Sequence, residues 1–287
     1  MFAHMLATLN EAEAKADSLS TPEIIHVLRA LSFDDFSLFF ICLPNPHFPK
    51  LSQRLPAMAS EEVQVSWTGE SGVRLLRQSL TFMRLTNDLS WRHRSQGLGN
   101  ARLLDLGCGY GRLLRLMYYY SDPERIFGCD PWERSIELCR EAGLLNRLDQ
   151  TDYLPKSLPY EPGSIDIAVA FSVFTHTSLR ATQTALQALR QTMHPDGMFV
   201  ATVRPIEFWN RCGQANGFDA APYIEQHQRD GFAFWPHQRG AVDGDVTYGD
   251  TSIDPRALAD LVPGWRYVGY EHSLDDELQV LVALKPA

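Results

Sequence analysis

Hydrophobic positions follow two spacings from residue 101 onward. Short apolar runs alternate with segments in which apolar residues recur every three or four positions. The runs are typical of buried strands, and the wider spacing is typical of helices that bury one face. Strands are therefore expected at residues 102–106, 126–129, 147–148, 165–170 and 198–203, with helices at 133–141 and 179–193. This alternation predicts a doubly wound α/β domain, in which helices cover both faces of a mostly parallel sheet.

The first part of the chain carries only helical signals. Ser20 and Ser60 each precede a segment that can start a helix, because a serine side chain caps free backbone N–H groups. Three prolines between positions 44 and 49 are expected to interrupt regular structure until Ser60. Apolar residues at steps of three and four predict a further helix over residues 72–89. We therefore expect a helical extension over residues 1–96.

The most informative segment lies where the first expected strand ends. Asp105 is followed by three alternate glycines, Gly107, Gly109 and Gly111, and then by an apolar helix. Glycines in such a turn let a ligand approach the backbone and leave N–H groups free to bind it. The spacing departs from the Gly-x-Gly-x-x-Gly pattern of dinucleotide-binding proteins. The segment indicates a ligand site, with a tight turn that binds nothing as the alternative.

This Asp-x-Gly-x-Gly-x-Gly segment resembles motif I of the class I S-adenosylmethionine-dependent methyltransferases. The resemblance implies a Rossmann-like sheet of seven strands with the last one antiparallel, and the expected strands 265–270 and 278–284 would complete it. It implies that Asp105 lies near the methionine end of S-adenosylmethionine, which is positively charged. Other residues that the resemblance assigns to the cofactor in this segment are Gly107, Cys108, Gly109 and Gly111.

The end of the second expected strand carries the next cofactor residues. Asp130 stands about two dozen residues after the glycine turn, where an acid can accept hydrogen bonds from both ribose hydroxyls. The family resemblance makes Asp130 the ribose ligand and places Pro131 and Trp132 along one adenine face. Asp130 can also cap the helix that follows, and the two roles are compatible.

Two later segments continue the resemblance in order and spacing. Asp152 would accept a hydrogen bond from the adenine amine, with Tyr153 beside it, although a turn-forming aspartate is the alternative. Phe171 and His176 lie at the carboxyl end of the fourth strand, where open α/β sheets bind ligands. Phe171 is expected beside the cofactor. His176 is the candidate general base for a hydroxyl acceptor, and a ring packed beside the cofactor is the alternative.

Composition narrows the class of acceptor. With 35 acidic and 26 basic residues the formal charge is −9, and no run of basic residues is present, which argues against nucleic acid. No apolar run approaches the roughly 20 residues of a membrane helix. The five cysteines are odd in number and form no Cys-x-x-Cys pair, which favours reduced thiols and a cytoplasmic location. We expect a small-molecule acceptor and no membrane partner; the sequence leaves a homodimer open.

The methyltransferase core is expected over residues 97–287. It contains an insertion at residues 204–254 that a minimal core does not need. Long insertions at this edge of a sheet usually serve binding, so we expect this one to form part of an acceptor pocket. Aromatic side chains that simply pack the insertion onto the core are the alternative. His227, His237 and Asp243 are too widely spaced to indicate a metal site. The insertion contains Phe208, Trp209, Phe218, Tyr223, Phe232, Phe234, Trp235 and Tyr248.

The sequence as a whole predicts methyl transfer from S-adenosylmethionine to a hydroxyl of a sugar or natural-product-like acceptor. One alternative is a pseudoenzyme that binds the cofactor without turnover, its pocket blocked by Trp67 or Trp235. A second is a nucleotide-binding oxidoreductase on a similar fold. The glycine spacing and the lack of a Tyr-x-x-x-Lys pair disfavour that second alternative.

Overall fold

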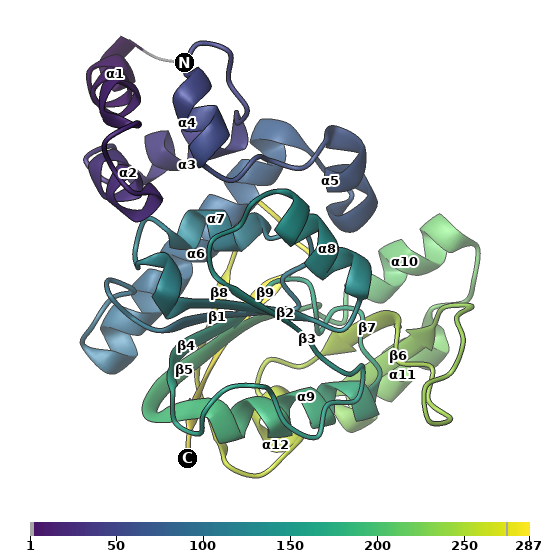
Figure 1. The fold of residues 1–287 in the computed structure, drawn as a ribbon. Helices are drawn as coiled ribbons and strands as arrows, with labels where there is room; N and C mark the ends of the chain where they lie inside the picture. Colours follow the sequence, from purple (N-terminus) through teal and green to yellow (C-terminus); the bar gives the residue numbers. More distant parts are fainter. Residues whose placement is uncertain (1–2, 274) are drawn as a thin grey trace. The chain divides into compact units, whose positions relative to one another are not determined.

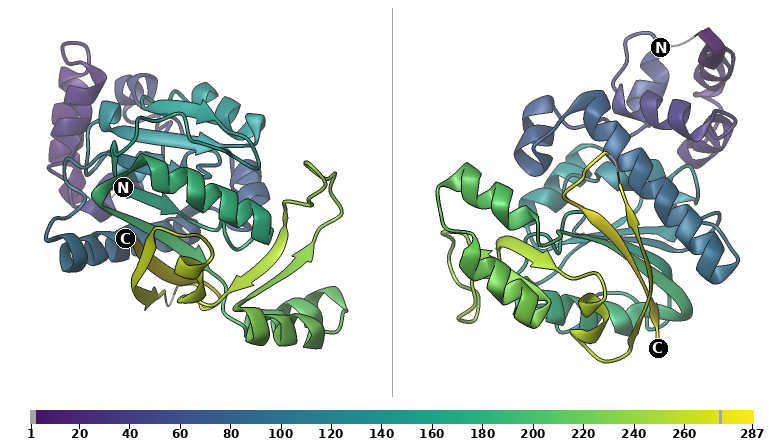
Figure 2. Two further views of the ribbon diagram at one scale, coloured as in Figure 1. Left: turned by 90° about the horizontal axis from the view of Figure 1, so that it is seen from below. Right: turned by 180° about the vertical axis from the view of Figure 1, so that it is seen from behind.

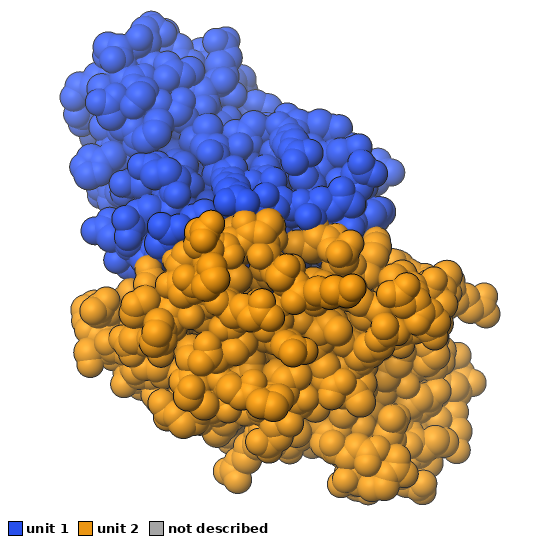
Figure 3. All heavy atoms as spheres, turned by 60° about the horizontal axis from the view of Figure 1, so that its bottom comes forward, with its two compact units in different colours: residues 1–84, 98–150 blue, residues 85–97, 151–287 orange. Residues whose placement is uncertain are grey.

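The structure, a computed structural model, describes residues 3–273 and 275–287 (Figure 1). The chain divides into two compact units (Figure 3). The first unit comprises residues 1–84 and 98–150, and the second comprises residues 85–97 and 151–287. Within the described residues, no helix has both the length and the apolar character required to cross a membrane.

A seven-stranded sheet has the strand order β3-β2-β1-β4-β5-β9-β8. Strands β1 and β3 flank β2 in parallel, β4 and β5 are parallel, and β9 runs antiparallel between β5 and β8. This confirms the expected doubly wound sheet, including its antiparallel strand. The bounds are β1 Leu103–Leu106, β2 Ile126–Asp130, β3 Arg147–Gln150, β4 Ile165–Ala170, β5 Met193–Val203, β8 Trp265–His272 and β9 Val280–Pro286.

The first unit surrounds β1, β2 and β3 with helices. Every residue of β1 and β2 is buried, which explains why their sequences are continuous apolar runs with few polar residues. Helix α7 packs against β1 and β2, and α8 against β2 and β3. The helices that begin in this unit are α1 Leu6–Lys15, α2 Thr21–Leu28, α3 Phe33–Ile41, α4 Pro49–Arg54, α5 Glu61–Thr68, α6 Gly72–Arg94, α7 Arg112–Met117 and α8 Glu133–Glu141, with 3-10 turns at Ala3–Met5 and Pro123–Arg125.

Serine caps begin several of the N-terminal helices. Ser20 and Glu23 form a reciprocal capping box at the start of α2, and Ser60 caps α5 as expected. Helix α4 differs from the prediction that the prolines interrupt regular structure until Ser60. Pro49 instead occupies the first helical position, where a missing N–H costs nothing. Helix α6 runs to Arg94, beyond the expected end.

The second unit contains β4, β5, β8, β9 and the insertion. The insertion folds into two helices and an antiparallel β6–β7 hairpin, which lie together in Figure 2. Trp209 is fully buried there, stacks on Tyr223 with ring centroids 4.6 Å apart, and donates a hydrogen bond to Ser252. The remaining elements are α9 Leu179–Thr192, α10 Phe208–Asn216, α11 Ala221–Asp230, β6 Phe232–Pro236, β7 Gly249–Ile253 and α12 Ala257–Asp260.

Candidate cofactor and acceptor sites

The glycine turn joins β1 to α7 by a path that only glycine follows without strain. Gly107, Gly109 and Gly111 all have positive φ, at 76°, 53° and 79°. The N–H groups of Gly107 and Cys108 donate to the Cys129 carbonyl at 2.8 and 3.0 Å, which fixes the turn to the end of β2. A Cβ atom on Gly111 would clash with Leu144. The loop is therefore a rigid backbone surface at the end of β1.

Asp105 lies directly before this loop and is 2% exposed. No described residue donates a hydrogen bond to its carboxylate. Burial raises the pKa of Asp105 to about 7, against the opposing charge of Arg112 and with a smaller contribution from Asp130. A buried carboxylate without a hydrogen-bond donor is costly unless a ligand supplies one. Asp105 therefore fits the positively charged methionine end of the expected cofactor.

Asp130 connects β2 to the glycine loop. One carboxylate oxygen accepts from the Gly109 N–H and the other from the Trp132 N–H, both at 2.9 Å. Burial raises the pKa of Asp130 in spite of these hydrogen bonds. The N-cap residue of α8 is Trp132, so the capping role considered for Asp130 is limited to this contact with the Trp132 backbone. The Ser135 hydroxyl also hydrogen-bonds to the carboxylate, and the lone pair that remains leaves an acceptor for a ribose.

Trp67 of α5 covers the same loop. Its ring stacks on Trp132 with centroids 4.7 Å apart and an interplanar angle of 13°. Its Nε1 donates to the Ser135 hydroxyl at 3.2 Å, and its Cδ1 would lie 3.2 Å from a Cβ on Gly109. The N-terminal extension thus contributes an aromatic cover to the loop within the first unit. The role of Trp67 toward a cofactor stays a prediction.

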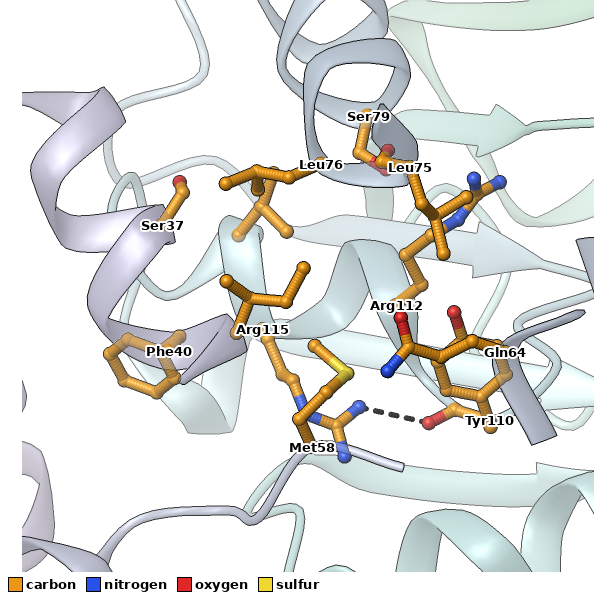
Figure 4. Close-up of a pocket in the computed structure, with 12 residues that line it drawn as sticks. Ser37, Phe40, Met58, Gln64, Leu75, Leu76, Ser79, Tyr110, Arg112 and Arg115 are labelled. Atoms are coloured by element: carbon orange, nitrogen blue, oxygen red, sulfur yellow. Dashed lines mark hydrogen bonds between the residues drawn. The ribbon is translucent and has the colours of Figure 1, made fainter. Parts of the chain in front are cut away.

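A small cavity of about 10 Å³ is lined by residues of α3, α5, α6 and α7, among them Ser37, Arg112 and Arg115, and by Tyr110 of the glycine loop (Figure 4). Arg115 is fully buried, and its guanidinium donates to the carbonyls of Tyr110 at 2.9 Å and Gly111 at 2.7 Å. It also donates to the Ala57 carbonyl at 2.5 Å, ahead of α5. Arg115 therefore ties the glycine loop to the segment that carries Trp67.

Three of the remaining expected cofactor residues, Asp152, Tyr153 and Phe171, belong to the second unit. Asp152 and Tyr153 lie in the irregular segment after β3 and are exposed, Tyr153 by 41%. Phe171 is half-buried directly after β4. Pro131, in the first unit, is half-buried between Asp130 and the exposed Trp132. The contacts of all four with a bound cofactor stay predictions.

His176, also in the second unit, lies in a half-buried polar cluster. Its Nδ1 is 2.9 Å from the Gly249 carbonyl and its Nε2 is 3.1 Å from the guanidinium of Arg204. The ring of Tyr248 stacks on it, almost parallel, at 5.2 Å. Burial and the neighbouring Arg204 lower the pKa of His176 to about 4. The imidazole is therefore held neutral in this arrangement.

Asp250 is the centre of this cluster. Its Oδ1 pairs with Arg204 at 2.5 Å, and its Oδ2 accepts from His237 Nε2 at 3.0 Å. Although burial acts in the opposite direction, His237 and Arg204 together lower the pKa of Asp250. Arg204 also donates to the Thr175 carbonyl at 2.8 Å. The cluster thus joins the loops after β4 and β5 to the β6–β7 hairpin.

Residues 104–201, which run from β1 into β5, match the family model of a methyltransferase domain. Those residues contain the glycine loop, Asp130 and His176. They include β2, β3 and β4 and most of β1 and β5, which all belong to the seven-stranded sheet. The chain carries a class I S-adenosylmethionine-dependent methyltransferase domain. It is an enzyme, and its cofactor is S-adenosylmethionine.

Solved structures resemble the methyltransferase at low sequence identity. A protein from Pyrococcus horikoshii OT3 is 14% identical, with 74% of this chain and 91% of that chain covered and a TM-score of 0.49. Magnesium protoporphyrin IX methyltransferase from Synechocystis PCC 6803, with bound S-adenosylhomocysteine, is 14% identical, with 79% and 94% covered and a TM-score of 0.48. These values leave the acceptor undetermined.

A third similar structure is 1,6-didemethyltoxoflavin-N1-methyltransferase from Burkholderia thailandensis. It is 15% identical, with 80% of this chain and 93% of that chain covered and a TM-score of 0.48. No curated protein matches the chain.

Sequence reasoning missed three charged residues of the methyltransferase. Arg115 lies among leucines in the buried helix α7, and Arg204 and Asp250 lie near the two ends of the insertion. A charged residue inside an apolar helix indicates that its side chain is buried with a partner. The role of Arg115 could therefore have been predicted from the sequence. Arg204 and Asp250 carry no such signal, because they are 46 positions apart and meet only in the folded second unit.

Proposed function

We propose that this methyltransferase methylates a hydroxyl group of a small-molecule acceptor. The observation that carries the proposal is the cluster of His176, Arg204, His237 and Asp250 at the carboxyl ends of β4 and β5. A hydroxyl is a weak nucleophile until its proton is removed, whereas an amine or a thiolate needs no such help. Imidazole and carboxylate groups held together in one cluster supply this acid and base chemistry.

We propose that the cofactor binds to the residues expected from the sequence. Asp105 faces the positive methionine end, Gly107, Cys108, Gly109 and Gly111 form the backbone floor, and Asp130 binds the ribose. Pro131, Trp132, Asp152 and Tyr153 surround the adenine, and Phe171 lies beside the cofactor. S-adenosylmethionine, when bound, supplies a methyl group on a positively charged sulfur. The unpartnered Asp105 carboxylate supports this assignment, because it lacks a hydrogen-bond donor without such a ligand.

The chain's own contribution to the reaction is positioning and proton removal. Methyl transfer is an in-line displacement, so the enzyme gains most by holding the acceptor oxygen opposite the sulfur and excluding water. In this proposal, the extension over residues 1–96 covers the cofactor through Trp67. The insertion at residues 204–254 forms part of the acceptor pocket. Trp235 and Tyr248 support that role, because both side chains are only half-buried and keep surface that an acceptor could contact.

Two measurements test the proposal. Isothermal titration calorimetry is expected to detect binding of S-adenosylhomocysteine and none of NAD. Radiolabelled S-adenosylmethionine is then supplied with a panel of phenols, sugars, amines and thiols, and label is expected in alkali-stable methyl ethers. Label found only on amines or thiols would refute the hydroxyl acceptor while leaving the methyltransferase assignment intact.

A further inference from the structure

Two histidines share the carboxylate of Asp250, but only one of them has a nitrogen free to accept a proton. His176 reaches Asp250 Oδ1 at 3.6 Å, and His237 reaches Oδ2 at 3.0 Å. The two rings come from different elements: His176 follows β4, and His237 follows β6. Their hydrogen bonds decide which nitrogen of each ring carries a proton.

Both nitrogens of His176 are occupied. The Gly249 carbonyl can only accept a hydrogen bond, so Nδ1 of His176 must donate. The guanidinium of Arg204 can only donate, so Nε2 of His176 must accept. A proton added at Nε2 would break this hydrogen bond and place a second positive charge against Arg204. His176 in this arrangement is a fixed neutral ring.

His237 has the opposite arrangement. The ionised Asp250 carboxylate accepts from Nε2, so the neutral ring carries its proton there and its lone pair at Nδ1. No described residue bonds to that Nδ1, and the His237 side chain is 36% exposed. A carboxylate that accepts a hydrogen bond from one ring nitrogen fixes the tautomer of the imidazole. It also stabilises the imidazolium that forms when the other nitrogen takes up a proton. His237 is therefore built to receive a proton at Nδ1.

We infer that His237, oriented by Asp250, is the catalytic base that removes the acceptor's proton, and that His176 and Arg204 position this pair. The inference rests on the proposed hydroxyl acceptor. The acceptor oxygen forms a bond to the methyl carbon, and the carbon–sulfur bond breaks with its electron pair left on sulfur. The hydroxyl proton moves to Nδ1 of His237 and is later released to water. Charge balances, because the positive charge lost at sulfur appears on the imidazolium.

The surroundings of His237 favour a phenolic acceptor. The rings of Trp235 and Tyr248 are edge-to-face with the His237 ring, with centroids 5.8 and 5.5 Å away, so an aromatic acceptor beside His237 would meet aromatic side chains. A phenol loses its proton near pH 10, within reach of an imidazole, whereas an aliphatic hydroxyl is far less acidic. The charged and titratable groups around His237 are Asp250, Arg204, His176, Tyr248, Cys212 and Arg239.

Chemical labelling tests the tautomers without any acceptor. Diethyl pyrocarbonate acylates an imidazole at an unprotonated, accessible nitrogen, and mass spectrometry of the intact enzyme's peptides identifies each labelled histidine. We expect His237 to react at least tenfold faster than His176, with exposed His272 as the reference rate. Labelling of His176 at the rate of His272, with His237 protected, would overturn the inference.

The role of His237 is then tested by measuring the rate at which the enzyme methylates the phenol 4-methylumbelliferone with radiolabelled S-adenosylmethionine. His237→Gln keeps an N–H for Asp250 but lacks the ring lone pair, so turnover is expected to fall about 100-fold or more. Its residual rate is expected to rise with pH, because the phenolate needs no base. Affinity for S-adenosylhomocysteine is expected to stay within twofold of the wild type. His272→Gln is the matched control, with wild-type turnover.

The outcomes separate this inference from the proposed function. Turnover of His237→Gln within threefold of the wild type, with an unchanged pH profile, would overturn the inference. Loss of turnover in His176→Gln alone would instead support His176 as the base, as the sequence predicted. If the wild-type enzyme methylates no phenol or other hydroxyl, the proposed function fails, and the labelling pattern alone then decides whether His237 holds the free nitrogen.

Discussion

Replacing Asp105 by asparagine is expected to make the folded methyltransferase more stable than the wild type, and this difference should grow as the pH rises. Burial raises the pKa of this carboxyl from 3.8 to about 7, so the folded protein favours the protonated form. The unfolded chain ionises above pH 4, and the folded state therefore loses stability between pH 4 and pH 7. Asparagine has nearly the same shape and carries no charge, so the variant avoids that loss.

The size of the effect follows from the pKa difference. One pKa unit corresponds to about 1.4 kcal/mol, so the raised pKa of Asp105 lowers the stability of the folded state by roughly 1.5 kcal/mol at pH 5 and by about 4 kcal/mol at pH 8. Any constant cost of burying the asparagine amide cancels when the two pH values are compared. The advantage of Asp105→Asn over the wild type should therefore grow by about 3 kcal/mol between pH 5 and pH 8.

The assay is urea denaturation of both proteins without cofactor, followed by circular dichroism at pH 5 and pH 8. Asp88→Asn, the same substitution at an exposed position of α6, is the matched control. A stability difference that is equal at the two pH values would refute the buried, proton-linked carboxyl. The same variant is expected to bind S-adenosylhomocysteine more weakly, since it loses the charge that faces the α-ammonium.

Other substitutions test the loop and its cover. Gly111→Ala forces a positive φ on alanine and drives its Cβ into Leu144, so unfolding free energy should fall by about 2–4 kcal/mol in denaturant titrations. Gly99→Ala, at a site with open space, is its control, and an equal loss there would contradict the steric argument. Trp67→Leu removes the stack on Trp132 and should weaken S-adenosylhomocysteine binding about tenfold by calorimetry. Unchanged affinity would show that Trp67 takes no part in the site.

Much of the methyltransferase core could be predicted from the sequence, because its signals are local. Strand β4 and helix α8 have the bounds that the apolar spacing predicts, and the glycine turn lies where β1 ends. Burial on both faces requires an apolar run, and positive φ requires glycine, so each feature is visible in a few adjacent residues. The family resemblance then supplied the number of strands, the antiparallel last strand and the cofactor.

The chemistry of the second unit could not be predicted in the same way. His176 and His237 were each noticed, but their hydrogen bonds depend on Arg204, Gly249 and Asp250, which lie far away in sequence. Which ring nitrogen keeps its lone pair is set by the donor or acceptor that the fold places beside it. The sequence alone determined the sheet, the turn and the cofactor class. Only the tertiary structure decided which histidine is free to take a proton, because that depends on contacts between distant segments.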